Sequence, residues 1–587
     1  MNKSRRLLLK VGIAISMLGL CLFATANAAD KTALKRVLNP YQQTLLKYKA
    51  KLNSTTAASR ANQATLSPYI VGGADAKPAA YPWMTALLIA EIPNAYDAQF
   101  CGGSLIAPDV VVTAAHCLDI LPGEEFVDVV VGAYDLSKVT ADQRVKVRGF
   151  VIHPGYDESN LNNDIGIIKL DHPIDTVSLP LMDPQQMEQL LPGEMLTAIG
   201  FGSLYDSPLS FPSVLQEVQL GYVDKAVCNE VMSVVGGITE TQICAGNSGQ
   251  IQDSCYGDSG GPLMANINGE WRLTGIVSWG LGCGLPDYYG VYTEAADFVQ
   301  WVADAADSLY LPGKSYFGYL SLGRKKRLQR TLDNWTGQAL TISDVAIQDR
   351  GLGFAITKDT CSDHTLATGQ TCDIEIEFEP SVPGRLLTQI VVTTTTGETA
   401  SSLLYGAALG EINASRALDS RDLDWYSGPE LNWMSVDMAD AVNGSAMQAG
   451  AISDLQTSAI LTYVYGPGTI NFNWQVSSEL DYDYLFLVVD GYIVDAVSGD
   501  SGWLSSSYDI VGSGEHAIMW AYNKDPYVSD GLDSAWLDNV SWHSQGNGGR
   551  GERIGDGSGS DGGGGLGGLS WLVSGIMLMA LRRRLLR

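Results

Sequence analysis

The chain has 587 residues and a formal net charge of −28 at pH 7, and 45% of its residues are hydrophobic. This length accommodates several domains of roughly 100–200 residues each. The acidic balance argues against nucleic-acid binding, because a phosphate backbone would repel the protein. With 64 glycines and few helix-period patterns, the composition favours β-rich modules joined by many turns.

The N-terminus, residues 1–28, has the pattern of a signal peptide. Arg5 and Arg6 precede an apolar stretch over residues 11–23, and the small residues of "ANAAD" follow. We therefore expect export across the inner membrane and cleavage after Ala28. The segment "SRRLLLK" is also typical of a twin-arginine signal, so the Sec and the twin-arginine routes both stay open, with Sec favoured.

The cysteine count points to disulfides. The chain has nine cysteines, and Cys21 leaves with the signal peptide, so eight remain (9 − 1 = 8). An even number in an exported protein predicts four disulfides in an oxidising compartment. Cys361 and Cys372 flank a Thr/Gly turn and are close enough in sequence to close a hairpin or loop.

The next two segments differ in character. Residues 29–69 are basic, include a Ser/Thr/Ala-rich stretch and show no clear core pattern, which indicates a detachable or flexible segment. Residues 70–306 alternate short apolar runs with Gly, Pro, Asn and Asp turns and so predict many short strands. This block ends in "EAADFVQWVADAAD", whose apolar residues have helical spacing.

Two further β-rich blocks follow. Within residues 307–409, "CDIEIEFEP" alternates apolar and acidic residues, which predicts a strand with one buried face. Within residues 410–545, Asp490 and Gly491 separate two apolar runs and predict a β-hairpin. Five tryptophans of this block are expected in its core, with a sugar-binding face as the alternative: Trp474, Trp503, Trp520, Trp536 and Trp542.

The C-terminus resembles a targeting segment. Residues 546–565 are mainly Gly, Ser and charged residues and predict a flexible linker. Residues 566–587 combine an apolar run with an Arg cluster and predict a transmembrane tail whose Arg cluster is cytoplasmic. The apolar run is short against the ~20 residues of a usual spanning helix.

Three separated motifs carry candidate chemistry. "TAAHC" contains His116, "NNDIGIIKL" contains Asp164, and "DSCYGDSGGP" contains Ser259 in a Gly-rich turn. A serine hydroxyl is a poor nucleophile unless a base removes its proton, and an imidazole titrates near neutrality and can be that base. A buried carboxylate would fix the imidazole tautomer and stabilise its protonated form.

These motifs, in the order His, Asp, Ser, resemble those of trypsin-like serine proteases of the chymotrypsin fold, which has two six-stranded β-barrels. The resemblance covers residues 70–306. It implies that His116 is the general base, Asp164 its orienting partner and Ser259 the nucleophile. It also implies that the backbone N–H groups of Gly257 and Ser259 form the oxyanion hole.

The same resemblance assigns the substrate pocket. Asp253, six residues before Ser259, matches the floor of the primary specificity pocket, where a poorly solvated carboxylate selects Arg or Lys. Gly280 and Gly290 match wall positions that leave room for a long side chain. The segment Ser278, Trp279 and Gly280 would pair with the substrate backbone as an added strand.

The resemblance also implies three disulfides: Cys101–Cys117, Cys228–Cys244 and Cys255–Cys283. Ala133 stands where the family's calcium loop would need an acidic residue. We therefore predict no metal site and no cofactor.

The family pattern implies a zymogen. Cleavage before "IVGG" would free the α-ammonium group of Ile70, which would pair with Asp258, and residues 29–69 would be the propeptide. Tyr69 departs from the pattern, because a protease that selects Arg or Lys would not cut after Tyr. We therefore expect a different protease to activate this one.

As a whole, the sequence predicts a mostly β protein: a chymotrypsin-like double β-barrel, an immunoglobulin-like domain (307–409) and a jelly-roll-like β-sandwich (410–545). The glycines before the tail resemble the Gly-Gly sorting signal of secreted Vibrio and Shewanella proteases, which use type II secretion. This implies a rhomboid-type protease that cuts the tail, and a secreted or surface-associated enzyme in a Gram-negative bacterium. The alternative is a surface adhesin whose C-terminal β modules bind glycans or a membrane.

Overall fold

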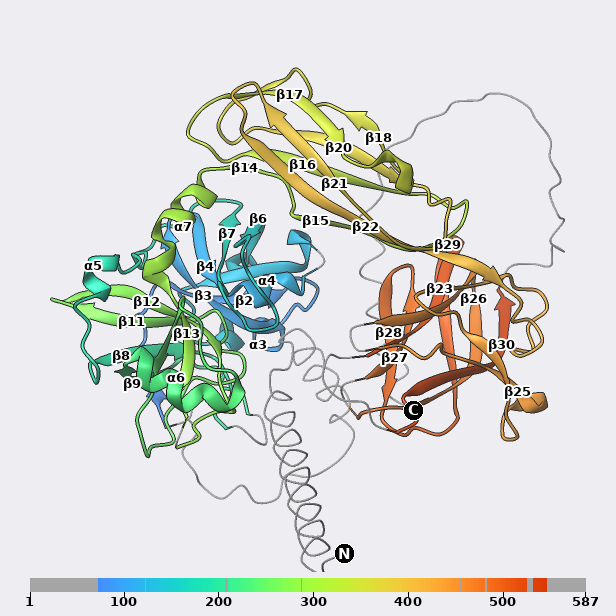
Figure 1. Cartoon of the computed structure of the whole chain (residues 1–587), viewed down its shortest axis with the longest axis horizontal. Helices are drawn as coiled ribbons and strands as arrows, with labels where there is room; N and C mark the ends of the chain where they lie inside the picture. Colours follow the sequence, from blue (N-terminus) through green and yellow to red (C-terminus); the bar gives the residue numbers. More distant parts are fainter. Residues whose placement is uncertain are drawn as a thin grey trace, which may run out of the picture.

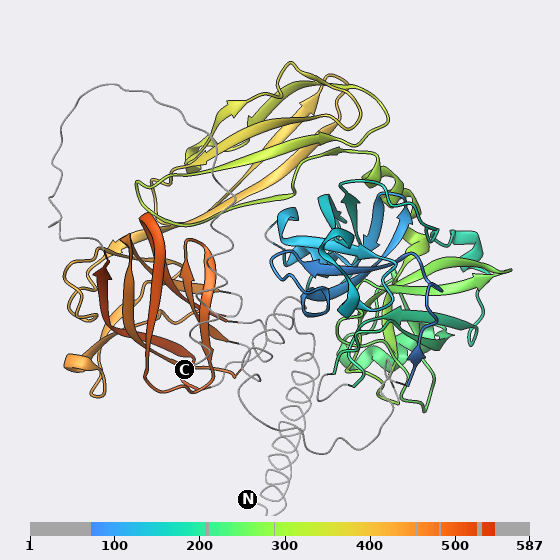
Figure 2. The same cartoon turned by 180° about the vertical axis from the view of Figure 1, so that it is seen from behind.

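The computed structural model describes residues 72–545, apart from 122, 206–209, 287, 454–455, 481–482 and 525–530. Three β-rich blocks follow one another and form an arch, in which the middle block bridges the other two (Figures 1 and 2). The predicted signal peptide, propeptide, linker and tail lie outside the described residues. Among the described residues, no helix is long and apolar enough to span a membrane.

The first barrel is closed by six antiparallel strands in the order β2-β3-β4-β7-β6-β5. Runs of β-branched residues such as "VVVT" and "VDVVV" favour these strands. The strands are β2 (Met84–Ile89), β3 (Gln99–Ala107), β4 (Val110–Thr113), β5 (Val127–Val131), β6 (Val145–Ile152) and β7 (Gly166–Leu170).

Short helices and turns connect these strands. They are α3 (Ala95–Ala98), α4 (Ala115–Asp119) and the 3₁₀ turns η1 (Glu124–Phe126), η2 (Leu136–Lys138) and η3 (Ala141–Gln143).

A second ring of six strands forms the other barrel, because β8 pairs with both β9 and β11. The strands are β8 (Met195–Gly200), β9 (Gln216–Val223), β10 (Gln242–Ala245), β11 (Pro262–Ile267), β12 (Glu270–Trp279) and β13 (Gly290–Glu294), and β1 (Ala74–Asp75) extends β9. The two barrels confirm the predicted chymotrypsin-like double barrel.

The helices of the second barrel are α5 (Pro184–Met187), α6 (Lys225–Met232) with η4 (Ser233–Val235), and η5 (Ala295–Phe298) with α7 (Val299–Ala306). The last pair confirms the helix predicted from the spacing of apolar residues at the end of this block.

The middle block consists of two sheets around one apolar core. One sheet has the order β14-β16-β20-β18, and the other contains β19, β17, β21 and β22 with β15 parallel to β22. The elements are β14 (Leu309–Tyr310), β15 (Lys314–Ser321), β16 (Lys326–Asn334), β17 (Leu340–Ile347), η6 (Arg350–Leu352), β18 (Phe354–Asp359), β19 (Thr365–Leu366), β20 (Thr371–Phe378), β21 (Gly384–Thr394) and β22 (Thr399–Ile412).

The alternation in β20 is confirmed. Ile374, Ile376 and Phe378 are fully buried, as predicted for one face of that strand.

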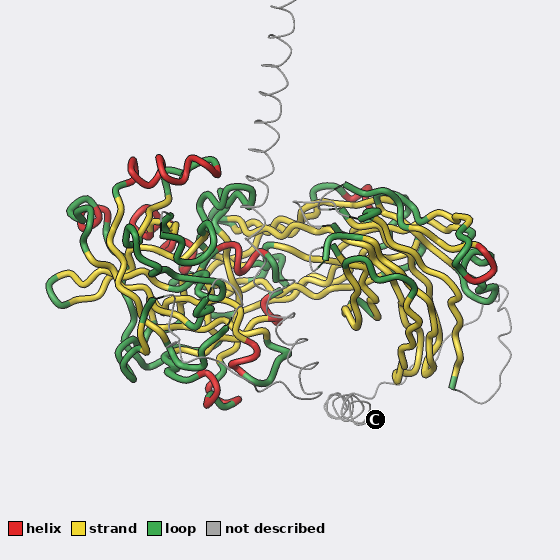
Figure 3. Tube along the Cα trace, turned by 90° about the horizontal axis from the view of Figure 1, so that it is seen from below, coloured by secondary structure: helices red, strands yellow, loops and turns green. Residues whose placement is uncertain are grey.

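The last block is also built mainly of strands, and Figure 3 shows strands running through each of the three blocks. Its strands are β23 (Trp425–Pro429), β24 (Met434–Asp437), β25 (Ser445–Gln448), β26 (Thr457–Ser477), β27 (Tyr484–Val489), β28 (Tyr492–Ser498), β29 (Leu504–Asn523) and β30 (Ser534–Ser544), with the turn η7 (Val442–Gly444). Strand β22 continues from the middle block into this one, where its residues Gly410–Ile412 pair with β23. The domain boundaries drawn from sequence stay predictions.

One local prediction for this block is confirmed, and a second is confirmed for three of its five residues. Strands β27 and β28 form the hairpin, and its turn residues Asp490 and Gly491 have φ of 54° and 90°, the left-handed region that this turn requires. Of the five tryptophans expected in the core, Trp474, Trp520 and Trp536 are buried, with exposed fractions of 2%, 0% and 5%. Trp503 and Trp542 are only half-buried.

The aromatic core of the middle block provides a test of its stability. Phe378 is fully buried and stacks on Phe354 with ring centroids 4.4 Å apart. Because truncation leaves a cavity, Phe378→Ala should destabilise this block by about 3–5 kcal/mol. Leu387, which is 56% exposed, provides the control: Leu387→Ala should change stability by less than ~0.5 kcal/mol. Calorimetry of the full chain measures both, and equal effects would contradict the described core.

Candidate active site

The candidate base His116 lies on the short helix α4 and is fixed by Asp164. Its ring Nδ1 is 2.7 Å from Asp164 Oδ2, and its backbone N–H donates to Asp164 Oδ1 at 2.9 Å. The Asp164 side chain is fully buried, and the His116 side chain is 12% exposed. Because an ionised carboxylate only accepts hydrogen bonds, Nδ1 carries the ring proton and Nε2 is left as the basic nitrogen.

Asp164 is held from the second barrel as well. Ser278, on β12, donates its hydroxyl to Asp164 Oδ2 at 2.6 Å. Thr293, on β13, donates to the backbone carbonyl of Asp164 at 2.9 Å. The carboxylate therefore sits at the contact between the barrels, and its position depends on both of them.

The turn that carries Ser259 rests on the first barrel. The backbone N–H of Gly102, on β3, donates to the carbonyl of Ser259 at 2.7 Å. Gly260 has a φ of +78°, and a Cβ there would lie 2.5 Å from the carbonyl oxygen of Gly102. Gly257 has a φ of +95°. Glycine thus allows the two backbones to approach, and it brings the Ser259 main chain beside β3 and α4.

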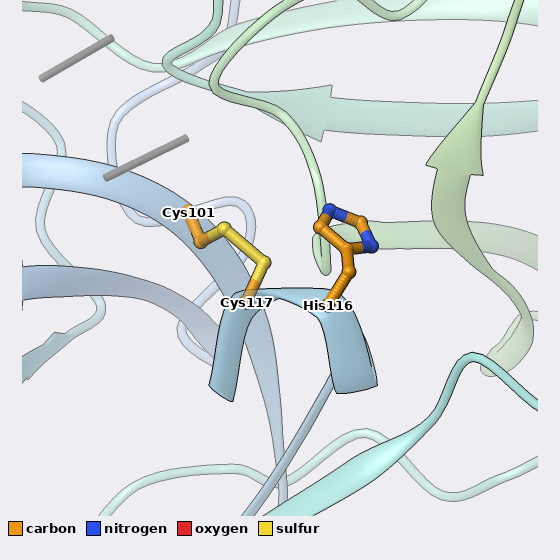
Figure 4. A group of neighbouring side chains, drawn as sticks. All are labelled: Cys101, His116 and Cys117. Carbon is orange, nitrogen blue, oxygen red and sulfur yellow. A yellow bond between two sulfur atoms is a disulfide. The ribbon is translucent and has the colours of Figure 1, made fainter. Parts of the chain in front are cut away.

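Cys101, His116 and Cys117 form a group whose potential ligand atoms lie within 4.8 Å of one another. Figure 4 shows the bond between the two sulfur atoms, with His116 beside it. Cys101 and Cys117 are joined at an S–S distance of 2.02 Å, so their sulfurs are not free thiolates for a metal. The disulfide instead anchors α4 to β3 next to the candidate base.

All four predicted disulfides are present. They are Cys101–Cys117, Cys228–Cys244, Cys255–Cys283 and Cys361–Cys372. The disulfide Cys255–Cys283 joins the Ser259 turn to the loop before β13. The same loop contacts Asp253 through the backbone N–H of Gly284.

Asp253 is buried, with an exposed fraction of 6%. Its Oδ2 accepts a hydrogen bond from the backbone N–H of Gly284 at 3.0 Å. Its Oδ1 is buried and has no hydrogen-bond partner among the described residues. Burial raises the pKa of Asp253 from 3.8 to about 7. A carboxylate oxygen in this state can accept a hydrogen bond from a buried cation.

The space beside Asp253 depends on a glycine. A Cβ at Gly290 would lie 2.7 Å from Asp253 Oδ1, so any side chain there would fill the space next to that oxygen. A Cβ at Gly280 would make only ordinary contacts, the nearest at 3.4 Å from the carbonyl oxygen of Gly282. Trp279, between Ser278 and Gly280, is half-buried and has an indole N–H without a partner among the described residues.

Asp258 lies inside the second barrel. It is 1% exposed, its Oδ1 accepts from the N–H of Gly202 at 2.7 Å, and its Oδ2 accepts from the N–H of Cys255 at 2.9 Å. Ile70, its expected partner, lies outside the described residues. Gly72 is described, and Gln252 donates from its side chain to the Gly72 carbonyl at 3.0 Å. The start of the described chain thus contacts the residue before Asp253.

Two contributors to the site were not predicted from sequence. Thr293 supports Asp164, and Gln99 donates to the carbonyl of Gly257 at 2.8 Å. Gln99 is 4% exposed, so this bond fixes the peptide that follows Gly257. Ser278 was predicted as a backbone partner of substrate, and its side-chain bond to Asp164 is an additional contact. The sequence carries no local signal for these contacts, because the partners are more than 100 residues apart.

Comparison with known proteins adds three findings. The sequence model of the trypsin family matches residues 70–302. The chain is similar to the structure of the secreted serine protease VesC from Vibrio cholerae, with 24% identity and a TM-score of 0.52 over 80% of this chain and 99% of that one. It also matches the structure of the Vibrio cholerae VesB protease, with 30% identity and a TM-score of 0.46 over 58% of this chain and 99% of that one.

The raised pKa of Asp253 predicts a pH-dependent stability. The folded state holds this proton up to about pH 7, whereas the unfolded state loses it near pH 3.8, so stability falls as pH rises between these values. Asp253→Asn removes the charge and keeps an oxygen for the Gly284 N–H. At pH 8 this variant should be more stable than the parent, by at most about 4 kcal/mol.

Urea denaturation of both proteins at pH 4 and pH 8, in a Ser259→Ala background that prevents self-digestion, measures this difference. The gain should disappear at pH 4, where both folded proteins are neutral at this position. If Asp253→Asn were less stable than the parent at pH 8, the claim that Asp253 is a buried carboxylate without a compensating charge would be wrong.

Proposed function

We propose that this trypsin-like serine endopeptidase, a member of the trypsin family through residues 70–302, is secreted and cleaves peptide bonds after Arg or Lys. The observation that carries the specificity is the buried Asp253, with one carboxylate oxygen left without a partner among the described residues. A guanidinium or ammonium group of the substrate would supply both the missing hydrogen bond and the compensating charge.

The proposed reaction is a two-step acyl transfer. His116 Nε2 takes the proton of the Ser259 hydroxyl while the oxygen attacks the substrate carbonyl carbon. The resulting imidazolium is stabilised by Asp164, and it then gives its proton to the leaving amine as the peptide bond breaks. Water, deprotonated by the same nitrogen, hydrolyses the acyl-enzyme and restores the Ser259 hydroxyl. The 2.7 Å contact between His116 and Asp164 supports these roles.

The oxyanion hole is proposed to consist of the backbone N–H groups of Gly257 and Ser259. Such donors typically contribute about 3 kcal/mol each to the stability of the transition state. The positive φ of Gly257 supports the assignment, because a residue with a side chain would be strained in this conformation. Trp279 and Gly280 are proposed to bind the substrate backbone beside this hole.

Activation is proposed to occur by cleavage between Tyr69 and Ile70, both outside the described residues. The new α-ammonium group would pair with Asp258, a buried carboxylate whose oxygens accept from the backbone N–H groups of Gly202 and Cys255. The contact between Gly72 and Gln252 supports a link between this N-terminus and the substrate pocket. A separate protease that accepts Tyr before the cleaved bond would be the activator.

The remaining parts of the chain are proposed to deliver the enzyme to its place of action. Residues 1–28 would direct export, and residues 566–587 would be a tail that a rhomboid-type protease removes after type II secretion. Both segments lie outside the described residues. The alternative function, a surface adhesin or glycan-binding protein, finds less support, because Trp474, Trp520 and Trp536 are buried and offer no surface for sugar stacking. Trp503 and Trp542 are half-buried.

The nucleophile and the pocket can be tested separately. Activated protein should hydrolyse peptides after Arg and Lys, and Ser259→Ala should abolish this activity. Asp253→Asn leaves a buried cation without its charge partner, at a cost of about 3–5 kcal/mol, so kcat/KM for Arg and Lys substrates should fall by roughly two to four orders of magnitude.

Asp171→Asn is the matched control, because that carboxylate is 66% exposed and its removal should leave activity unchanged. A library of peptides that varies the residue before the cleaved bond measures all four proteins. Full activity of Asp253→Asn on Arg and Lys peptides would contradict the pocket assignment, and activity of Ser259→Ala would contradict the nucleophile.

Activation has its own test. Purified zymogen incubated alone should keep its N-terminus, because an enzyme that selects Arg or Lys does not cut after Tyr69. Tyr69→Arg should make the same protein activate itself, and N-terminal sequencing should then find Ile70. Spontaneous appearance of Ile70 in the parent zymogen would contradict a separate activator.

A further inference from the structure

The middle block is docked on the barrel that carries His116 and Asp164. In Figure 1, β14 and β15 run beside the part of the first barrel formed by β6, β7 and α4. The side-chain contacts between the two blocks involve α4 and β6. We call the contact between these two blocks the docking surface. On the protease side it consists of Asp119 and residues 148–150. On the middle block it consists of Tyr310, Lys314, Asp333, Trp335 and Gly369.

A bidentate ion pair lies at the centre of the docking surface. Arg148, on β6, donates from Nε and Nη2 to the two carboxylate oxygens of Asp333, with the second contact at 2.6 Å. Arg148 Nη2 also donates to the carbonyl of Gly369 at 2.8 Å, and Asp333 accepts from the indole N–H of Trp335 at 2.9 Å. Asp333 is 3% exposed. The Arg148 side chain is 28% exposed, so the pair is partly buried. Bidentate pairs between Arg and a carboxylate are stronger than single contacts and geometrically specific.

Two aromatic rings cover the next residue of the same strand. Tyr310 and Trp335 stack with centroids 4.2 Å apart and planes 9° from parallel. A Cβ at Gly149 would lie 2.4 Å from the Tyr310 ring and 2.7 Å from the Trp335 ring. The hydroxyl of Tyr310 also accepts from the backbone N–H of Phe150 at 3.3 Å. The strand is therefore held by ring contact, by backbone bonding and by the ion pair.

The docking surface connects directly to the catalytic pair. Lys314, on β15, forms an ion pair with Asp119, the last residue of α4 and three residues after His116. On the other side, β6 pairs with β7 at Phe150 and Ile168 and at Ile152 and Gly166. Strand β7 begins two residues after Asp164. His116 therefore lies on a helix that the middle block contacts directly, and Asp164 precedes a strand that pairs with the contacted strand β6.

From this arrangement we infer that Arg148 and Asp333 are positioning residues for catalysis. The docked middle block holds His116 and Asp164 at hydrogen-bond distance from each other. This inference rests on the catalytic roles proposed above. A displacement of about 1 Å far from the reacting atoms can reduce a rate 100-fold. A partial release of β6 and α4 should therefore affect kcat more than KM, because the substrate pocket belongs to the second barrel.

Arg148→Ala is the direct test, and Arg385→Ala is its matched control. Arg385 also forms an ion pair between blocks, with Glu430, but this pair joins the middle and last blocks. Activated full-length proteins are compared on a small Arg peptide, with active enzyme counted by active-site titration. Arg148→Ala should lower kcat roughly 10-fold with little change in KM, whereas Arg385→Ala should match the parent.

A pH profile separates positioning from simple loss of folded enzyme. If Asp164 stabilises the protonated His116 less well, the acid limb of kcat/KM should move to lower pH in Arg148→Ala. A smaller amount of otherwise normal enzyme would leave the limb in place. Arg148→Lys keeps one donor and should recover part of the loss. A parent-like kcat and pH profile in Arg148→Ala would overturn the inference.

A second measurement does not depend on activity. Hydrogen exchange of the full-length Ser259→Ala protein should speed up in α4 and β7 when Arg148→Ala is added, and it should stay unchanged there with Arg385→Ala. If the parent shows no Ser259-dependent hydrolysis, the proposed function fails while this exchange result still decides the coupling. If Arg148→Ala does not fold, Lys314→Ala removes the more exposed contact to α4 and undergoes the same two tests, where parent-like results overturn the inference.

Discussion

The site depends on the carboxylate of Asp164, which is fully buried. Removing such a charge from water is costly unless hydrogen bonds and a partner replace the lost solvation. For Asp164, the replacements come from the imidazole and the backbone N–H of His116 in the first barrel and from the hydroxyl of Ser278 in the second. The hydrogen bonds to this carboxylate are therefore complete only when the two barrels are packed together.

Asp253 is the opposite case within the same fold. It too is buried, but burial raises its pKa to about 7 and one of its oxygens has no hydrogen-bond partner among the described residues. A structural carboxylate would be expected to have its partners inside the protein, as Asp164 does. The incomplete solvation of Asp253 is the feature that a cationic substrate can relieve. The two residues thus differ in the way that their proposed roles require: Asp164 has its hydrogen-bond partners inside the protein, and Asp253 has one oxygen without a partner among the described residues.

The parts of the structure that depend on local pattern were predictable from sequence. The alternation of β20 and the hairpin at Asp490 follow from side-chain periodicity and turn conformation. The resemblance of the motifs to those of trypsin-like proteases predicted the contact between His116 and Asp164. The long-range contacts were not predictable. Nothing near Gln99 in sequence indicates that it will bond to Gly257, and Arg148 looks like an ordinary strand residue until the middle block packs on it. These contacts form only when elements far apart in the chain meet, and no single stretch of sequence encodes them.

The molecule is a trypsin-like serine protease whose first barrel contacts the middle block, and its proposed substrate pocket lies in the second barrel. The most direct test of this account is the crystal structure of the activated protein with a peptide aldehyde that ends in arginine. The account predicts a covalent bond from Ser259 Oγ to the aldehyde carbon, with the guanidinium within about 3 Å of Asp253 Oδ1. An adduct on another residue, or a guanidinium bound away from Asp253, would contradict it.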